Sequence, residues 1–223
     1  MIRPDEIIRT KRKSIALIVE RDGRLIVRAP LRAKEETINE FIEHKAKWIL
    51  KKQAEIKAYY PPFLPKEYVN GEGFWFLGQI HKLQIVDEKK PKLFLNGNFR
   101  LAKSALHKPE AVFEKWYRKQ AYQVLTGRVQ WLAAKYGYQY KRIKITSART
   151  RWGSCSAGGT LNFAWRLVMA PMPIIDYVVV HELVHLQVKN HSKKFWGRVG
   201  VIMPDYQQEI EWLEKNGHLL NLG

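Results

Sequence analysis

The chain has 223 residues and a formal net charge of +18, and this length suits one or two domains with a sizeable core. Hydrophobic residues make up 46% of the sequence, which excludes a disordered protein, and the single cysteine excludes an internal disulfide. The first residues lack the apolar core of a signal peptide, and no apolar run is long enough to cross a membrane. We therefore expect a cytoplasmic protein.

The positive charge is concentrated in two parts of the chain. Residues 1–66 contain sixteen Lys/Arg and nine Asp/Glu, and residues 108–150 contain ten Lys/Arg and two Asp/Glu. Residues 151–223 are nearly neutral, with seven and six. This imbalance favours a polyanionic partner such as nucleic acid, or an anionic substrate such as a nucleotide. A lysine-rich surface that serves solubility alone is the alternative.

The N-terminal part is predicted to be small, basic and rich in strands. Apolar segments at 14–19 and 25–27 flank Arg21-Asp22-Gly23, and Asp-Gly between two apolar runs predicts a β-hairpin. Apolar residues at spacings of three and four predict one helix at 37–58, capped by Thr37 and ended by Pro61-Pro62. Short strands are predicted to follow near 74–76, 81–86, 92–95 and 99–101.

The C-terminal part is predicted to mix helices and strands. A long helix is expected from Pro109 to Tyr136, because proline suits a first turn and Gly137 would end the helix. An alternating strand, a hairpin and a closing helix are predicted at 140–147, 150–167 and 205–216. We expect two domains, a basic β-rich region with one helix at 1–106 and a second domain at 107–223.

The sequence His181-Glu182-Leu183-Val184-His185 follows an apolar run at 174–180. In a helix, residues four positions apart lie on one face, separated by about 6 Å along the axis. The two imidazoles can then bind one tetrahedral metal ion, and Glu182 can act as a general base on a metal-bound water. A buried helix with two structural histidines is the alternative.

A third candidate ligand, His191, follows six residues after His185. A catalytic zinc takes three protein ligands and keeps one position open for water. The helix must end before His191 can reach the ion, and Asn190 suits that turn because asparagine tolerates the left-handed conformation. His191 could instead be a surface histidine, in which case the third ligand would come from the closing helix, as Glu209 or Glu211.

Three segments together resemble the YgjP-like metallopeptidase family: WGSCS at 152–156, the apolar run into HELVH, and NHSKKFW at 190–196. That family is related to SprT-like and WLM-type zinc peptidases, and the resemblance extends along the whole chain. It implies an α+β fold, with a small β-rich N-terminal region before a minimal zincin-like domain. It also implies zinc ligands at His181, His185 and His191, and Glu182 as the catalytic acid or base.

Other residues are weaker candidates for a role in the site. Arg151 and Arg166 are candidates for contacting a substrate or an oxyanion, although a structural or surface role is the alternative for each. Cys155 is expected to be a buried structural residue, because a fourth protein ligand would close the metal site. Three basic residues on one predicted strand are candidates for contacting a polyanion: Lys141, Arg142 and Lys144.

The leading functional hypothesis is a zinc-dependent metallopeptidase, in which zinc-activated water attacks a peptide bond with Glu182 as general base. The basic segments would recruit it to nucleic acid. The resemblance also implies that the strand at 161–167 binds extended substrate through its main chain. The alternatives are a metal-dependent nucleotide phosphohydrolase, of the nucleoside triphosphate pyrophosphatase type, and a non-catalytic nucleic-acid-binding module with a structural metal.

Overall fold

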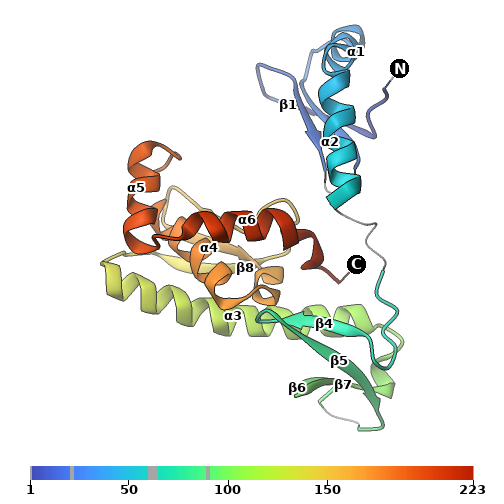
Figure 1. Ribbon diagram of the computed structural model, residues 1–223, viewed down its shortest axis with the longest axis vertical. Helices are drawn as coiled ribbons and strands as arrows, with labels where there is room; N and C mark the ends of the chain where they lie inside the picture. Colours follow the sequence, from blue (N-terminus) through green and yellow to red (C-terminus); the bar gives the residue numbers. More distant parts are fainter. Residues whose placement is uncertain (1, 21–22, 60–64, 89–90, 223) are drawn as a thin grey trace. The chain divides into compact units, whose positions relative to one another are not determined.

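A computed structural model of the chain describes residues 2–20, 23–59, 65–88 and 91–222. The chain forms two compact units, Met1–Leu64 and Pro65–Gly223 (Figure 1). Each unit has its own hydrophobic core. Within the described part of the chain, no helix is long and apolar enough to span a membrane.

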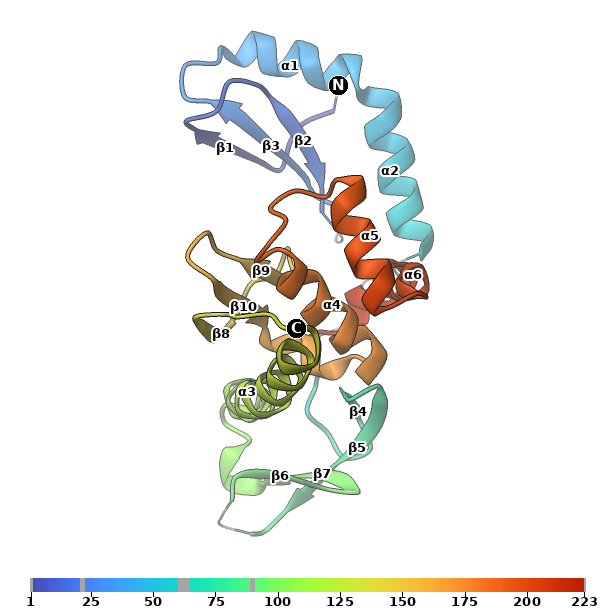
Figure 2. The same ribbon diagram turned by 90° about the vertical axis from the view of Figure 1, so that its left-hand side faces the viewer.

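The N-terminal unit combines a three-stranded sheet with two helices: β1 (Glu6–Thr10), β2 (Ala16–Val19), β3 (Leu25–Pro30), α1 (Glu35–His44) and α2 (Ala46–Tyr59). The strand β3 is central, parallel to β1 and antiparallel to β2. Leu25, Val27 and Ala29 alternate along β3, and Ile38 and Ile42 lie one turn apart on α1. These two apolar faces form the core, and Figure 2 shows α1 running along the sheet.

The predicted N-terminal hairpin is confirmed by the pairing of Val19 with Leu25 across β2 and β3. The N–H of Gly23 bonds to the carbonyl oxygen of Glu20 at 2.9 Å, and the φ of Gly23 is +87°, a value that favours glycine. Four residues that were predicted to form turns or to end the helix are not among those that the structure describes: Arg21, Asp22, Pro61 and Pro62.

The prediction of a single helix at 37–58 is wrong, because the helix begins at Glu35 and is interrupted at Lys45. Lys45 has a ψ of 8°, away from the helical value, and α2 starts directly after it. Thr37 is therefore inside α1 and does not cap it. No proline or glycine marks the interruption, so apolar spacing alone predicts one continuous helix.

The second unit begins with a four-stranded sheet: β4 (Gly73–Phe76), β5 (Gln79–Val86), β6 (Leu93–Asn96) and β7 (Asn98–Ala102). Its order is β4-β5-β7-β6, and all four strands coincide closely with predicted ones. The turn between β4 and β5 has positive φ at both Leu77 and Gly78, as a type I′ hairpin requires. Gly97, also with positive φ, connects β6 to β7.

The boundary between the compact units, at 64/65, differs from the expected boundary at 106/107. The reason is an aromatic cluster that joins this sheet to the long helix α3 (Pro109–Tyr136). Phe113 of α3 stacks on Phe74 of β4 with ring centroids 4.3 Å apart, and it lies 5.2 Å from Phe99 of β7. Because the strands at 73–102 share this core with α3, they belong to the second unit.

The rest of this unit contains a three-stranded sheet and further helices: β8 (Arg142–Thr146), β9 (Gly153–Cys155), β10 (Thr160–Ala164), the 3-10 helix η2 (Trp165–Met169), α4 (Met172–Val184), α5 (Lys193–Ile202) and α6 (Tyr206–Asn216). The sheet order is β8-β10-β9, with β8 parallel and β9 antiparallel to β10. The second predicted hairpin is thus confirmed, although its second strand ends at Ala164. Gly137 ends α3 in the left-handed conformation, as predicted.

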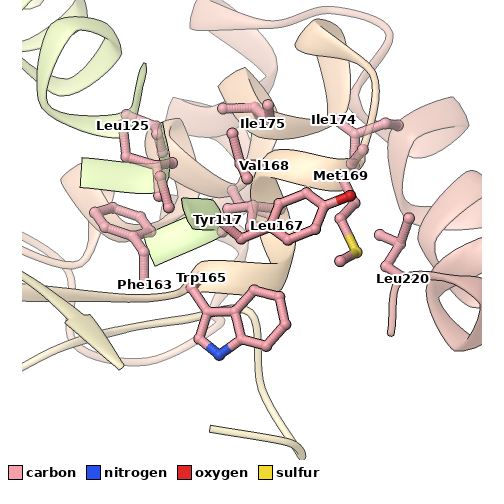
Figure 3. Close-up of a cluster of buried hydrophobic side chains, with 14 of the residues drawn as sticks. Tyr117, Leu125, Phe163, Trp165, Leu167, Val168, Met169, Ile174, Ile175 and Leu220 are labelled. Carbon is pink, nitrogen blue, oxygen red and sulfur yellow. The ribbon is translucent and has the colours of Figure 1, made fainter. Parts of the chain in front are cut away.

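The helix α4 is packed on several sides, because α3, α5, α6 and β9 all contact it. This burial explains why the sequence at 174–180 is uniformly apolar. Figure 3 shows side chains from α3, β10, η2 and α4 meeting in the core: Tyr117, Leu125, Phe163, Trp165 and Ile175. The fold is mixed α+β, as predicted, and it holds the C-terminal end of α4 in a fixed place.

Candidate active site

The C-terminal end of α4 carries the first two candidate ligands. His181 lies in its last turn, and His185 follows Val184, the last residue of the helix. The N–H of His185 bonds to the carbonyl oxygen of His181 at 3.2 Å, so helical geometry continues through both residues. The two side chains therefore lie on the same face, as the sequence predicts.

Three imidazole nitrogens converge on one point. The Nε2 atom of His185 lies 3.1 Å from that of His181 and 3.2 Å from that of His191, and the third pair is separated by 3.0 Å. The Nδ1 atom of His185 lies 2.9 Å from the carbonyl oxygen of Val188, to which it donates. That bond leaves Nε2 of His185 with its lone pair directed at the other two histidines.

This geometry fits a metal ion. In a tetrahedral site, three nitrogens that each lie about 2.0–2.1 Å from the ion are about 3.3–3.4 Å from one another. The observed distances between the Nε2 atoms are close to this value. Burial, followed by the charges of His185 and His191, lowers the pKa of His181 to about 3, and burial lowers that of His185. Neutral imidazole is the form that binds metals. Within the described residues, neither Glu209 nor Glu211 belongs to this group.

The chain reaches His191 by a route that differs from the expected one. Tight turns follow α4, in which the N–H groups of Leu186 and Val188 bond to the carbonyl oxygens of Leu183 and Val184. Asn190 does not adopt the left-handed conformation. Among the described residues other than glycine, only Tyr68 and Leu77 have a positive φ. Its predicted role in the turn is therefore wrong, since the continued turns after α4 already reverse the chain.

An aromatic platform supports the three histidines. Phe195 of α5 is fully buried, and its ring centroid lies 4.9 Å from His181, 4.5 Å from His185 and 4.8 Å from His191. Trp196 stacks on His191 at 5.7 Å. Neither aromatic residue was predicted to have a role. Their positions four and five residues after His191, within one helix, are the signal that could have indicated this contact.

Glu182 is buried beside the histidines, with 5% of its surface exposed. Burial raises its pKa to about 8, while the charge of Arg151 acts in the opposite direction. Its Oε2 atom has no hydrogen-bond partner within the described residues. A buried carboxyl group with a raised pKa and an oxygen that forms no hydrogen bond is typical of a group that transfers protons.

The strand β9 packs its backbone directly against Glu182. A Cβ atom on Gly153 would lie 2.5 Å from Oε1 and 2.7 Å from Cγ of Glu182, closer than any side chain can approach. Only glycine therefore fits at this position. Gly153 was not predicted to have a role, although a glycine within a strand indicates close approach of another group.

The prediction that the strand at 161–167 binds extended substrate requires correction. The strand β10 lies between β8 and β9, so both of its main-chain edges are already paired. The strand β9 lies at the edge of this sheet and next to α4. A strand binds a peptide by β-addition through a main-chain edge that is not already paired. Among the residues that the structure describes, β9 is paired only with β10.

The arginine candidates are in different environments. Arg166 is buried and lies over the ring of Trp165. Its guanidinium donates to Oδ1 of Asn221 at 3.1 Å and to the carbonyl oxygens of Ser147 and Ala148. Its contacts hold loops together and do not involve the histidines. Arg151 is exposed and lines a pocket that also includes Gly153.

The remaining candidates lie on or next to the strands β9 and β8. Cys155 is on β9 and is half-buried, so the expectation of a buried residue is only partly met. Burial raises the pKa of its thiol. The three basic candidates, Lys141, Arg142 and Lys144, are exposed at or just before β8, the other edge strand. The half-buried Ile143 and Ile145 alternate with them, as predicted.

Comparisons with known proteins identify one family. The model of the family described as YgjP-like, metallopeptidase domain, matches residues 13–216. No curated protein sequence matches the chain. Similar solved structures include the metallopeptidase zymogen of Pyrococcus abyssi abylysin, with 20% identity and a TM-score of 0.38 over 41% of this chain and 93% of that one. The zymogen of Methanocaldococcus jannaschii jannalysin has 20% identity and a TM-score of 0.34 over 39% and 93%.

Proposed function

The chain belongs to the YgjP-like metallopeptidase family, and we propose that its metal ion is zinc, bound by His181, His185 and His191, with Glu182 as the general base. The observation that carries this proposal is the convergence of three Nε2 atoms, each within 3.2 Å of the other two. Three neutral nitrogen donors with a free fourth position are typical of catalytic zinc.

Each residue of the site has a separate task in this proposal. Zinc, when bound, supplies a Lewis acid that polarises the peptide carbonyl and makes water a nucleophile at neutral pH. The bond from His185 to Val188 fixes the tautomer that presents Nε2. Glu182 takes a proton from the attacking water and delivers it to the leaving nitrogen. The platform of Phe195 keeps the three imidazoles in position.

The edge strand β9 supplies the surface on which we expect the peptide to lie. Its main chain is paired with β10 on one side only within the described residues. An extended peptide added to the other side would pass beside α4 and Glu182, because Gly153 contacts that carboxylate. Main-chain recognition of this kind selects extended, unfolded segments rather than a particular sequence.

The metal ligands can be tested by metal content. A His191→Ala protein should bind zinc at least about 100-fold more weakly than the wild type, because loss of a second-shell partner alone costs about 10–100-fold. Zinc per chain after dialysis against a chelator measures this. His44→Ala, which changes an exposed residue at the end of α1, is the control. If His191→Ala bound as much zinc as the wild type, His191 would not be the third ligand, and Glu209 or Glu211 would become the candidate.

The general base can be tested by Glu182→Gln, which keeps the shape of the side chain and removes the proton acceptor. The variant should retain zinc and lose hydrolysis of an unfolded protein such as reduced casein by at least about 100-fold. Nucleoside triphosphates are assayed in parallel. Glu182-dependent release of phosphate or pyrophosphate, without protein cleavage, would contradict the proposal and favour the phosphohydrolase alternative.

The exposed basic residues support a further part of the proposal, recruitment to nucleic acid. Arg142 and Lys144 lie on the edge strand β8 with their side chains exposed. Residues 108–150 as a whole carry ten basic and two acidic residues. Such a surface attracts phosphate backbones without reading their sequence, which suits an enzyme whose protein substrates are bound to nucleic acid.

A further inference from the structure

A pocket of about 160 Å³ lies on the sheet that carries β9. Its lining includes Thr146, Arg151, Gly153, Ser154 and Asn162. Ser154 and Asn162 are directly paired between β9 and β10, so their side chains are on the same face of the sheet. The pocket is therefore bounded by polar side chains from neighbouring strands, and its wall includes the glycine that contacts the proposed base.

The size of the pocket determines what it can hold. Pockets for complete small-molecule ligands have volumes of about 300–1,000 Å³, so a space of about 160 Å³ is too small for a nucleotide. It is sufficient for a single amino-acid side chain. A peptide strand added to β9 would direct alternate side chains to the two faces of the sheet. Those on the face of Ser154 and Asn162 would reach this pocket.

The chemistry of the pocket selects an anion. Arg151 is the one charged residue among its lining. No hydrogen bond or ion pair engages its guanidinium within the described residues, although its charge acts on Glu182. By contrast, Arg118, Arg128 and Arg166 each donate to fixed partners. A free guanidinium presents a planar pair of donors that matches a carboxylate.

A second donor is available on the wall of the pocket. The amide Nδ2 of Asn162 donates to both the carbonyl oxygen and Oγ of Ser154, each at 3.2 Å. The hydroxyl of Ser154 accepts one of these bonds, so its own proton remains available to donate. The described residues that line the pocket include no Asp or Glu, although the acidic Glu182 lies against Gly153 in the pocket wall.

We propose that this pocket is a substrate subsite that binds the side-chain carboxylate of an acidic residue, with Arg151 as its anchor and Ser154 as a second donor. The inference rests on the proposed peptidase function and adds a substrate class to it. The enzyme would cleave extended peptides with Glu or Asp at one fixed position relative to the scissile bond. Arg151 here determines specificity and does not take part in bond cleavage.

The test begins with the zinc-loaded full chain and reduced casein, whose cleavage sites are mapped by mass spectrometry. Peptides around the main site are then made with Glu, Gln or Lys at each of the three positions on either side. The wild type should prefer Glu over Gln by about 10-fold or more at one position, since hydrogen bonds to charged groups contribute about 1.5–3 kcal/mol. Arg151→Gln should abolish that preference, and Arg151→Glu should reverse it in favour of Lys.

A binding measurement separates recognition from chemistry. In the Glu182→Gln background, the Glu peptide should bind more tightly than the Gln peptide by a similar factor, and Arg151→Gln should remove the difference. Arg149→Gln is the matched control, because Arg149 is exposed, two residues away, and outside the pocket lining. It should leave the preference intact.

The outcomes distinguish the subsite from the function on which it rests. Cleavage without any preference for Glu, or an equal loss of kcat for all peptides in Arg151→Gln, would overturn the subsite and leave the peptidase in place. The second result would indicate that Arg151 stabilises the transition state instead. Absence of cleavage by zinc-loaded wild type would overturn the proposed function, and the subsite with it.

Discussion

At the scale of single residues, the site depends on close contacts that leave no room for substitution. Gly153 contacts Glu182 so closely that a methyl group would overlap its carboxylate. The same glycine belongs to the edge strand and lines the pocket beside it. One residue thus links the proposed base, the proposed peptide-binding edge and the proposed subsite, and its contact with Glu182 explains why it must lack a side chain.

Gly153→Ala provides a direct test of this contact. The new Cβ would lie 2.5 Å from Oε1 of Glu182, so the carboxylate must move, and displacement of a catalytic group by about 1 Å can cost about 100-fold in rate. Casein hydrolysis should fall by about that factor while zinc content is unchanged, since the three atoms nearest to the new Cβ all belong to Glu182.

The control for this prediction is Gly158→Ala in the same hairpin. A Cβ at Gly158 meets nothing within 4 Å, and its φ is not in the left-handed region. This variant should hydrolyse casein at the wild-type rate. Full activity of Gly153→Ala as well would show that Glu182 either moves without consequence or is not the base.

At the scale of secondary-structure elements, local patterns predicted that His181 and His185 share one helix face, but not the side chains that pack against them. The spacing of His181 and His185 places them on one face of any α-helix, so the sequence is sufficient for that pair. The contact of Phe195 with all three rings depends on how α5 folds back against the end of α4. That packing is tertiary, and no short-range pattern encodes it.

Strand pairing shows the same division between local and long-range information. The alternation at 142–146 and the Gly-Gly turn before Thr160 were sufficient to predict β8 and the hairpin of β9 and β10. Which strand lies at the edge was not predictable, because β8 pairs with β10 in parallel from outside the hairpin. This pairing closes one side of β10 and leaves β9 as the strand beside α4.

The limits of the domains also depended on long-range packing. Composition and turn residues suggested that the β-rich part ends near residue 106, before the long helix. The aromatic contacts of Phe113 with Phe74 and Phe99 instead join four of those strands to the helical part. A sequence of alternating apolar residues predicts that a face is buried, but it does not identify the surface that buries it.

At the scale of the whole molecule, charge and chemistry are separated along the sequence. Residues 1–66 and 108–150 carry most of the excess of basic residues, whereas residues 151–223, which supply the histidines and Glu182, are nearly neutral. This separation is consistent with one part of the protein binding a polyanion while another performs hydrolysis. It also means that the two properties can be altered independently by mutation.

Neutralising the basic residues at β8 tests that separation. If Lys141, Arg142 and Lys144 contact phosphates, the triple change to Gln should reduce the salt dependence of duplex DNA binding, because each contact contributes a slope of about −0.9 in log K against log salt. Fluorescence anisotropy over a salt series measures the slope, which should become shallower by about 2–3. Zinc content and casein hydrolysis should remain unchanged, since these exposed side chains are on or next to β8 and include none of the candidate ligands.

The matched control removes the same number of charges from the nearly neutral part of the chain, by changing three exposed residues to Gln: Lys189, Lys193 and Lys194. An equal loss of slope in both variants would mean that net charge alone governs binding, with no dedicated surface at β8. If the wild type binds neither DNA nor RNA even at low salt, the charge of +18 serves solubility. Recruitment to nucleic acid would then be rejected and the peptidase proposal would stand without it.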